Sequence, residues 1–273
     1  MSVHALPDNR RITMHDLAEA TRRGEPWPMI TAYDALTARI FDEAGVPALL
    51  VGDSAAMVVY GHDSTLPVTV DELIPLVRAV VRGAPRAFVV ADLPFGSYQS
   101  SPAQALETSA RFLKEGGAHA VKLEGGAPML PQIEALVGAG IPVIGHLGLT
   151  PQSVNALGGY RVQGRGEAGD RLMHDAKAMQ AAGACAIVLE AVPSELATRV
   201  TDMLSIPTIG IGAGSGTDAQ VIVWQDLVGL TSGPAPRFVK RYADIRTVMH
   251  EAVVEWSNDV RSGAYPTEEH SYT

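Results

Sequence analysis

The sequence predicts an α/β protein folded as a (β/α)8 TIM barrel, with an extra N-terminal helix and closing C-terminal helices. The first observation is that short runs rich in Val, Ile and Leu alternate with longer amphipathic segments about eight times. Alternation of this kind predicts βαβ units around a parallel sheet. The second is that no linker rich in Ser, Pro or charge interrupts the 273 residues, a length at which one barrel is common. We therefore expect a single domain over residues 1–273.

Eight apolar runs are expected to form the strands. Runs of this kind are typical of strands buried on both faces, as in a parallel sheet. A doubly wound open sheet is the competing architecture, but eight units close most economically as a barrel. The runs lie at 29–33, 47–54, 86–94, 119–125, 141–148, 185–192, 206–214 and 221–229.

Amphipathic segments between these runs carry helix start and stop signals. The segment 71–83 follows a Thr and ends at Gly83, and the segment 101–117 has Ser101 as an N-cap candidate with Pro102 behind it. A third helix is expected at 169–183. We also expect a helix over 12–24, one or two closing helices over 238–262, and an ordered loop or frayed end over 263–273.

Composition excludes several classes of protein. Hydrophobic residues make up 47% of the chain and charged residues 19%, which argues for a large core and against disorder. The net charge of −9 disfavours a nucleic-acid partner. Cys185 is the only cysteine and is expected to be an inert core residue, so a disulfide framework is excluded. Residues 1–12 lack a signal-peptide run, and no stretch is long and apolar enough to span a membrane. A cytoplasmic location is expected.

Polar residues occur where the predicted strands end. The carboxyl ends of barrel strands meet on one face, which is where barrel active sites form. The sequence therefore predicts that residues far apart along the chain converge there. These residues are Asp53, Asp92, Lys122, Glu124, His146 and Glu190.

Asp53 and Asp92 would repel each other at neighbouring strand ends unless a cation lay between them. Two aspartates without cysteine or paired histidine favour a hard cation such as Mg2+ over Zn2+. Glu124 would ligate the ion or hold a water bound to it. The alternative is that each Asp caps a helix or pairs with an Arg, and that Glu124 is a solvated turn residue.

Lys122 and Glu124 lie on the same side of their strand, because side chains alternate along it. In a barrel that side is the interior, where a lysine needs an anion such as a substrate carboxylate; a buried Lys–Glu or Lys–Asp pair is the alternative. His146 is expected to contact substrate, although a lone histidine is more often structural. Glu190 has apolar neighbours that would raise its pKa and suit a general base, whereas a rim ion pair would leave it structural.

Two loops carry weaker signals. The Gly-rich stretch 210–216 follows the seventh strand, where many barrels bind phosphate, although glycine also serves close packing. The stretch 158–166 has two Arg and four Gly and is interpreted as a rim segment, serving as a lid or a subunit contact.

Ten motifs together resemble the ketopantoate hydroxymethyltransferase family, in order and from about residue 12 to 271. The segment after QGRG, read as EAGD, looks one residue shorter than in some relatives, which puts the contacts of that rim loop in doubt. The motifs are ITAYD (30–34), VGDS (51–54), GHDSTLPVT (61–69), ADLPF (91–95), KLEGG (122–126), GHLGLTPQS (145–153), GGYRVQGRG (158–166), LEAVP (189–193), IGIGAG (209–214) and EEHS (268–271).

The resemblance implies an enzyme that transfers a one-carbon unit from 5,10-methylenetetrahydrofolate to 3-methyl-2-oxobutanoate, giving 2-dehydropantoate for pantothenate biosynthesis. It implies one Mg2+ per subunit and a cytoplasmic homodecamer. The residue roles that it implies are as follows: Asp53, Asp92 and Glu124 ligate Mg2+; Asp53, Ser54, Asp92, Lys122 and His146 bind substrate; Glu190 accepts the proton.

Two rival hypotheses are kept. One is a Mg-dependent oxo-acid lyase or mutase of the phosphoenolpyruvate mutase and isocitrate lyase kind, which usually carries a reactive Cys in a mobile loop. The only Cys of this chain lies in a predicted strand. The other is a scaffold without activity, which would need none of the strand-end residues.

Overall fold

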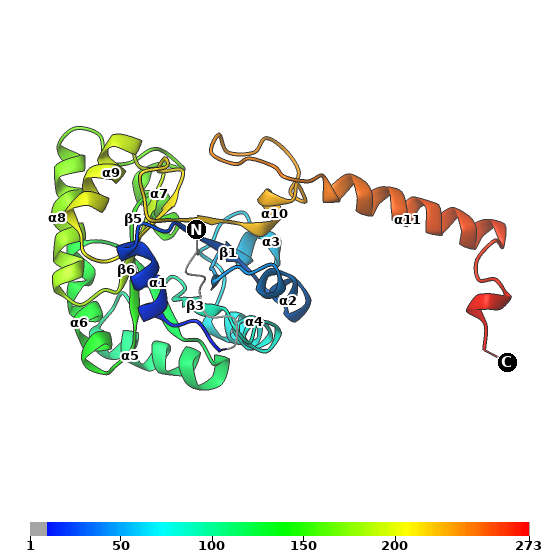
Figure 1. Cartoon of the computed structure of the whole chain (residues 1–273), viewed down its shortest axis with the longest axis horizontal. Coiled ribbons are helices and arrows are strands. Elements are labelled where there is room, and N and C mark those ends of the chain that lie inside the picture. Colours follow the sequence, from blue (N-terminus) through cyan, green and yellow to red (C-terminus); the bar gives the residue numbers. More distant parts are fainter. Residues whose placement is uncertain (1–9, 273) are drawn as a thin grey trace. The chain divides into compact units, whose positions relative to one another are not determined.

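The computed structural model describes residues 10–272, and in it eight parallel strands form a closed barrel in chain order, with β8 pairing β1 (Figure 1). The (β/α)8 prediction is confirmed, and the open doubly wound sheet is excluded. The strands are β1 (Trp27–Thr31), β2 (Ala48–Val51), β3 (Phe88–Asp92), β4 (Ala120–Glu124), β5 (Val143–Gly148), β6 (Ala186–Glu190), β7 (Thr208–Ile211) and β8 (Ala219–Ile222).

Helices connect most of the strands and surround the barrel (Figure 1). The helices that precede β8 are α1 (Met14–Arg22), α2 (Ala35–Glu43), α3 (Ala55–Val58), α4 (Val70–Gly83), α5 (Pro102–Arg111), α6 (Leu130–Gly138), α7 (Val154–Leu157), α8 (Glu167–Ala181) and α9 (Ser194–Met203). Two more helices follow β8 in the chain and are α10 (Trp224–Leu227) and α11 (Ile245–Ser262). The chain also contains one π-helix, η1 (Phe112–Gly116), within the described residues. Short 3-10 helices are η2 (Ala127–Met129), η3 (Pro151–Ser153) and η4 (Glu268–His270).

Capping residues explain where the expected helices begin. Thr69 and Glu72 form a reciprocal capping box at the start of α4, which satisfies two backbone N–H groups that the helix leaves free. Ser101 caps α5 by accepting from Gln104 N, and Pro102 lies at the first helical position, as the sequence predicted. The predicted helix at 101–117 continues past Arg111 as η1.

Two sequence predictions about the C-terminal part need correction. The eighth strand ends at Ile222, and residues 224–227 form α10, so the predicted strand over 221–229 is wrong beyond its first residues. A short apolar run does not by itself distinguish a buried strand from a helix. Residues 212–218 between β7 and β8 contain no helix. The closing helix begins at Ile245 rather than 238, and Asp244 caps it.

The barrel interior is filled with apolar side chains from alternate strand positions. One buried cluster combines inward-facing residues of all eight strands with three residues from the N-terminal segment, Ile12, Leu17 and Ala20. Ile12 N donates to Arg86 O, just before β3, so the segment that leads into α1 is fixed near the amino ends of the strands. The apolar layer thus lies in the amino-terminal part of the barrel, and the opposite end is left for polar side chains.

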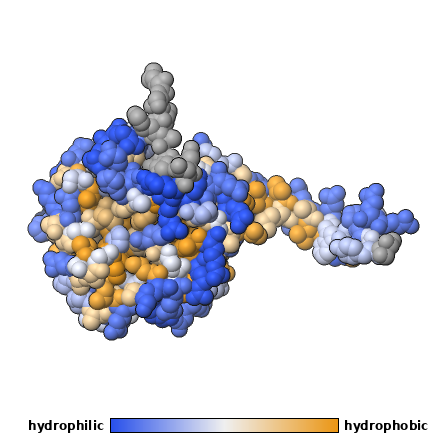
Figure 2. Space-filling view, turned by 60° about the horizontal axis from the view of Figure 1, so that its bottom comes forward, coloured by the Kyte–Doolittle hydropathy of each residue, from blue (hydrophilic) through white to orange (hydrophobic). Residues whose placement is uncertain are grey.

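Contacts divide the chain into two units, one ending at Val223 and the other beginning at Trp224. The expected single domain over 1–273 therefore stays a prediction. In the second unit, α11 has no buried residue, and its exposed apolar side chains include Met249, Val253 and Trp256. Figure 2 shows apolar residues among hydrophilic ones on the molecular surface.

The expectation about a signal peptide falls largely on residues 1–9, which lie outside the described residues. Within residues 10–272, no helix is both long enough and apolar enough to cross a membrane.

Candidate active site

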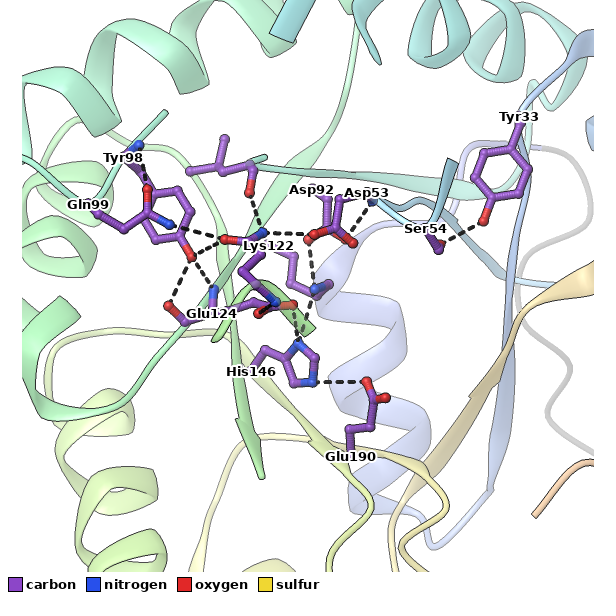
Figure 3. Close-up of polar contacts among 12 residues, drawn as sticks. Tyr33, Asp53, Ser54, Asp92, Tyr98, Gln99, Lys122, Glu124, His146 and Glu190 are labelled. Carbon is purple, nitrogen blue, oxygen red and sulfur yellow. Dashed lines mark hydrogen bonds and ion pairs between the residues drawn. The ribbon is translucent and has the colours of Figure 1, made fainter. Parts of the chain in front are cut away.

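The predicted strand-end residues form one buried cluster at the carboxyl ends of β2 to β6 (Figure 3). Four of them continue the inward-facing positions of the apolar layer: Asp92 follows Val90, Lys122 and Glu124 follow Ala120, and His146 follows Ile144. The register pairs Asp92 with Lys122 and Glu124 with His146. The shared interior face of residues 122 and 124 is confirmed, since both side chains are buried in line with Ala120.

Asp53 and Ser54 come directly after β2. The Asp53 backbone N–H donates to Asp92 Oδ2 at 3.1 Å, so the turn after β2 is tied to the end of β3. Ser54 Oγ lies 2.8 Å from Tyr33 Oη, which places the serine beside the turn that follows β1. Asp53 is only 4% exposed, which excludes a role as a solvated surface carboxylate.

Lys122 pairs with Asp92 inside the barrel, with Nζ 2.7 Å from Asp92 Oδ1. Burial acts to lower the pKa of Lys122, but the charges of Asp92, Glu124 and Asp53 outweigh it and hold the pKa above its ordinary value. The ammonium is therefore charged in a nearly dry site. The alternative of a buried Lys–Asp pair describes this contact correctly, and substrate binding by Lys122 stays a prediction.

His146 lies between two carboxylates. Its Nε2 is 3.3 Å from Glu190 Oε2, and its Nδ1 is 3.3 Å from Glu124 Oε1 and 3.2 Å from Lys122 Nζ. Burial and the Lys122 charge act to lower the pKa of His146, but the hydrogen bonds to Glu124 and Glu190 outweigh them and raise it to about 9. His146 therefore bridges the two carboxylates, with its Nδ1 also beside the Lys122 ammonium.

Glu190 has a polar neighbour as well as the apolar ones expected from sequence. Its side chain is 17% exposed and faces His146, so it borders on the open end of the barrel. The backbone around it is tightly built: Leu149 N donates to Glu190 O, and a Cβ at Gly148, whose φ is +93°, would clash with the same carbonyl. Ala191 adopts a left-handed φ of 47°, which turns the chain sharply after the glutamate.

The metal hypothesis can be tested against the pKa values of the three buried carboxylates, Asp53, Asp92 and Glu124. Burial raises the pKa of Asp53, and the negative charges of Asp92 and Glu124 raise it further. Burial also raises the pKa of Asp92, against the opposing effect of Lys122. For Glu124, burial is outweighed by the hydrogen bond and charge of His146, so its pKa is lowered. A divalent cation would relieve this repulsion, and three carboxylates are donors that suit Mg2+.

The positions of the carboxylate oxygens show which groups they contact in this structure. Across residues 10–272, no three His, Cys, Asp or Glu side chains are grouped closely enough to hold a metal ion. The carboxylates instead face Lys122 Nζ, Gln152 Nε2 and His146 Nδ1. The chemistry of the donor set fits a hard cation, whereas in this arrangement each carboxylate is bonded to a neighbouring nitrogen atom.

Two residues of the cluster were not singled out from the sequence. Gln152 in η3 donates from Nε2 to Asp53 Oδ2 at 2.9 Å, and Tyr98 Oη lies 2.8 Å from Gln152 Oε1. Both residues come several positions after the ends of β5 and β3, in loops that a search of strand ends does not cover. The only signal for Gln152 was its place in the GHLGLTPQS motif.

The other sequence predictions concern the periphery of the site. Cys185 lies at the amino end of β6, opposite to Glu190, its Sγ donates to Val143 O, and burial raises its pKa to about 12. These features agree with an inert thiol. The 158–166 segment contacts the site's surroundings: Gln163 N donates to Ala191 O, and Tyr160 Oη lies 3.9 Å from Met57 Sδ. Its role as lid or subunit contact stays a prediction, as does anion binding by 210–216.

Comparison with known structures supports the fold. A phosphonopyruvate hydrolase solved in complex with oxalate and Mg++ matches with a TM-score of 0.61 at 13% identity, covering 95% of this chain and 93% of that one. A 2,3-dimethylmalate lyase of the PEP mutase/isocitrate lyase superfamily matches with a TM-score of 0.59 at 17% identity, covering 95% and 91%. At these identities the likeness concerns the barrel alone.

Sequence comparison is more specific. The model of the family described as ketopantoate hydroxymethyltransferase matches residues 11–268. The 3-methyl-2-oxobutanoate hydroxymethyltransferase of Frankia casuarinae is 68% identical over 97% of this chain and 90% of the relative. That of Saccharopolyspora erythraea is 63% identical over 98% and 92%. With its barrel, its buried strand-end cluster and these near full-length matches, the chain belongs to the ketopantoate hydroxymethyltransferase family.

Proposed function

We propose that this chain transfers a hydroxymethyl group from 5,10-methylenetetrahydrofolate to 3-methyl-2-oxobutanoate, forming 2-dehydropantoate for pantothenate biosynthesis. The observation that carries the proposal is the buried cluster of acidic and basic side chains at the carboxyl ends of β2 to β6. The chain is also 68% identical to a relative named 3-methyl-2-oxobutanoate hydroxymethyltransferase. Such a cluster supplies the three elements needed to remove a proton next to a ketone: an anion anchor, charge stabilisation and a base.

The oxo acid would bind through its carboxylate and ketone oxygens. Lys122 is the buried cation nearest to the carboxylates, and it would neutralise the substrate carboxylate or the enolate charge that develops. Ser54 and the backbone of the turn after β2 would contact the same end of the substrate. Asp53 and Asp92 lie beside them, and His146 would make a further polar contact.

Asp53, Asp92 and Glu124 would hold one Mg2+ ion. When bound there, the ion would supply positive charge to the ketone oxygen as negative charge develops on it. Burial, and after it repulsion from Asp92 and Glu124, raises the pKa of Asp53, and a cation between the three side chains would relieve that repulsion. They are also almost dry, so their interaction with a cation would be strong.

Glu190 would accept the proton. The C–H bond on the carbon next to the ketone breaks, its electron pair forms the enolate double bond, and the proton passes to the Glu190 carboxylate. His146 Nε2 lies 3.3 Å from Glu190 Oε2 and would hold the carboxylate toward the substrate. The enolate carbon then forms the new C–C bond with the one-carbon unit of methylenetetrahydrofolate. The two C–N bonds of that unit break and leave tetrahydrofolate, and a water molecule supplies the hydroxyl group of the product.

The decisive experiment is the complete reaction followed by mass spectrometry. Purified protein is mixed with 3-methyl-2-oxobutanoate, methylenetetrahydrofolate and Mg2+, with EDTA and a Glu190→Gln variant as controls. The expected product gains one CH2O unit and disappears in both controls. A folded wild-type protein that makes no such product would contradict the proposal, and a panel of other oxo acids would then test the lyase and mutase alternative.

A cytoplasmic location and a homodecameric assembly complete the proposal. Both follow from the family resemblance and stay predictions. The lyase and mutase alternative is disfavoured by the position of Cys185, which lies at the end of β6 away from the site and outside any loop at the barrel mouth.

A further inference from the structure

One buried amide beside the candidate metal ligands has no part in the proposed chemistry. Gln152 lies in η3, just after β5, and is 5% exposed. Its Nε2 donates to Asp53 Oδ2 at 2.9 Å and to Leu93 O at 3.0 Å. Its Oε1 accepts from Gln99 Nε2 at 3.1 Å and lies 2.8 Å from Tyr98 Oη. Both N–H groups and both lone pairs of this amide therefore have partners.

This pattern sets the orientation of the amide. Rotating it by half a turn would place Oε1 against the Asp53 carboxylate and Nε2 against the Gln99 amide nitrogen. Both contacts would be repulsive, and the whole group is buried, so unmatched polar atoms there are expensive in free energy. Gln152 therefore presents a donor, and never an acceptor, to Asp53.

The backbone of the same residue holds a second carboxylate. Gln152 N donates to Glu124 Oε2 at 2.9 Å. Tyr98 Oη, which contacts Gln152 Oε1, also accepts from Glu124 N at 3.1 Å (Figure 3). Gln152 is thus bonded to carboxylates from the ends of β2 and β4 through two independent groups, one in its side chain and one in its backbone.

We propose that Gln152 is a positioning residue for the divalent cation: its side-chain amide orients the Asp53 carboxylate and its backbone N–H orients that of Glu124. This inference rests on the metal site of the proposed function. Groups that hold metal ligands in this way tune affinity, and their loss typically weakens binding or activity about ten- to a hundredfold.

The two roles can be separated by mutation. Gln152→Leu removes the side-chain bonds to Asp53 and Leu93 but keeps the backbone N–H that binds Glu124. Gln132 offers a matched control, because it is another buried glutamine, 4% exposed, in α6. Its Nε2 lies 3.4 Å from the carbonyls of Tyr98 and Gln99, and it has no bond to the carboxylates. Gln132→Leu is therefore the same chemical change at a buried glutamine that contacts Tyr98 and Gln99 but none of the carboxylates.

The test measures Mn2+ binding to the full-length protein without substrate, from the electron paramagnetic resonance signal of free Mn2+. We expect Gln152→Leu to weaken Mn2+ binding about tenfold or more, and Gln132→Leu to stay within about twofold of the wild type. Thermal unfolding in EDTA is recorded for all three proteins. A merely structural role would lower the melting temperature without changing the Mn2+ affinity.

A second variant covers the case in which Gln152→Leu does not fold. Tyr98→Phe removes the hydroxyl at Gln152 Oε1 and should weaken Mn2+ binding by a smaller factor. The inference is overturned if the wild type binds Mn2+ and both variants bind it equally well, a result that leaves the proposed function intact. If the wild type binds no Mn2+ and turns over in EDTA, the metal part of the proposed function is wrong, and the positioning role is wrong with it.

Discussion

Glu190 differs from the other acidic residues of the cluster in position and partner. It borders on the open end of the barrel, and its neighbour is a histidine rather than a second carboxylate. This placement lets a substrate reach its oxygens while Lys122 and the carboxylates of β2 to β4 remain deeper. The proposed role of Glu190 as base is therefore best tested by following the transferred proton.

We predict that Glu190→Gln binds 3-methyl-2-oxobutanoate but fails to exchange the substrate's C3 proton. Loss of a general base should slow the exchange by at least about a hundredfold, whereas binding depends on other side chains. Exchange with deuterium oxide is followed by nuclear magnetic resonance, and binding by calorimetry. Normal exchange in this variant would remove Glu190 as the base.

His119 is the residue that should make stability depend on pH away from the site. Its Nδ1 accepts from Val89 N, and its own backbone N donates to Val89 O, so it joins β3 to the start of β4. Burial, with a contribution from the Arg11 charge, lowers the pKa of His119 from 6.5 to about 4. Between these pH values the unfolded chain binds a proton that the folded protein does not.

The expected result is that His119 contributes stability above pH 6.5 and that this contribution is lost as the pH falls towards 4. His119→Asn keeps an acceptor but does not titrate. Its melting temperature should therefore fall less than that of the wild type across this window, as measured by calorimetry. Parallel curves for the two proteins would show that His119 has no such role.

At the scale of elements, α1 and the segment before it take part in the barrel core. Leu17 is 1% exposed and belongs to the same apolar cluster as inward-facing residues of the eight strands. The capping box of Thr13 and Asp16 begins this helix and so helps to place Leu17. An added helix of this kind is therefore part of the fold rather than an appendage.

Leu17→Ala should lower the free energy of unfolding by about 2–5 kcal/mol, because it leaves a cavity in this cluster. Leu36→Ala on α2 is the matched control, since that side chain is 77% exposed and should change stability by less than about 0.5 kcal/mol. Urea denaturation measures both. Equal effects of the two substitutions would mean that α1 does not pack against the barrel.

Along the barrel axis, the apolar residues that stabilise the fold and the charged residues of the candidate site occupy opposite ends. Apolar residues fill the amino-terminal part of the interior, and charged residues occupy the carboxyl end, where burial disfavours their ionised forms. The fold should therefore persist without the metal, and removal of one carboxylate should not unfold it.

Accordingly, EDTA should abolish turnover without unfolding the protein, and Mg2+ should restore activity. Asp53→Ala should lose metal-dependent activity yet stay folded in EDTA, because the loss of one mutually repelling buried charge offsets the Gln152 N–H that it leaves unpaired. Circular dichroism and the product assay measure the two properties. Full activity of Asp53→Ala and of Asp92→Ala would show that the metal assignment is wrong.

Periodicity along the sequence was sufficient to predict the barrel and the interior face of Lys122 and Glu124. Strand alternation is a local property, and the carboxyl ends of parallel strands converge by topology alone. The same reasoning predicted Asp53, Asp92, His146 and Glu190 as members of one site. The caps Thr69 and Ser101 were also readable, because capping acts within three residues.

Only the tertiary structure decided which of these side chains are bonded to each other. Gln152 reaches Asp53 across 99 positions of sequence, and Tyr98 reaches Gln152 across 54, so no local pattern points to either contact. The sequence predicted apolar neighbours for Glu190 and did not predict its contact with His146, which comes from the neighbouring strand β5. The end of β8 at Ile222 was not predicted either, because whether a short apolar run forms a strand or a helix depends on the residues that pack around it. Sequence thus determined which residues face the site, and packing determined their partners and charge states, because hydrogen bonds and burial depend on distances that only the folded chain sets.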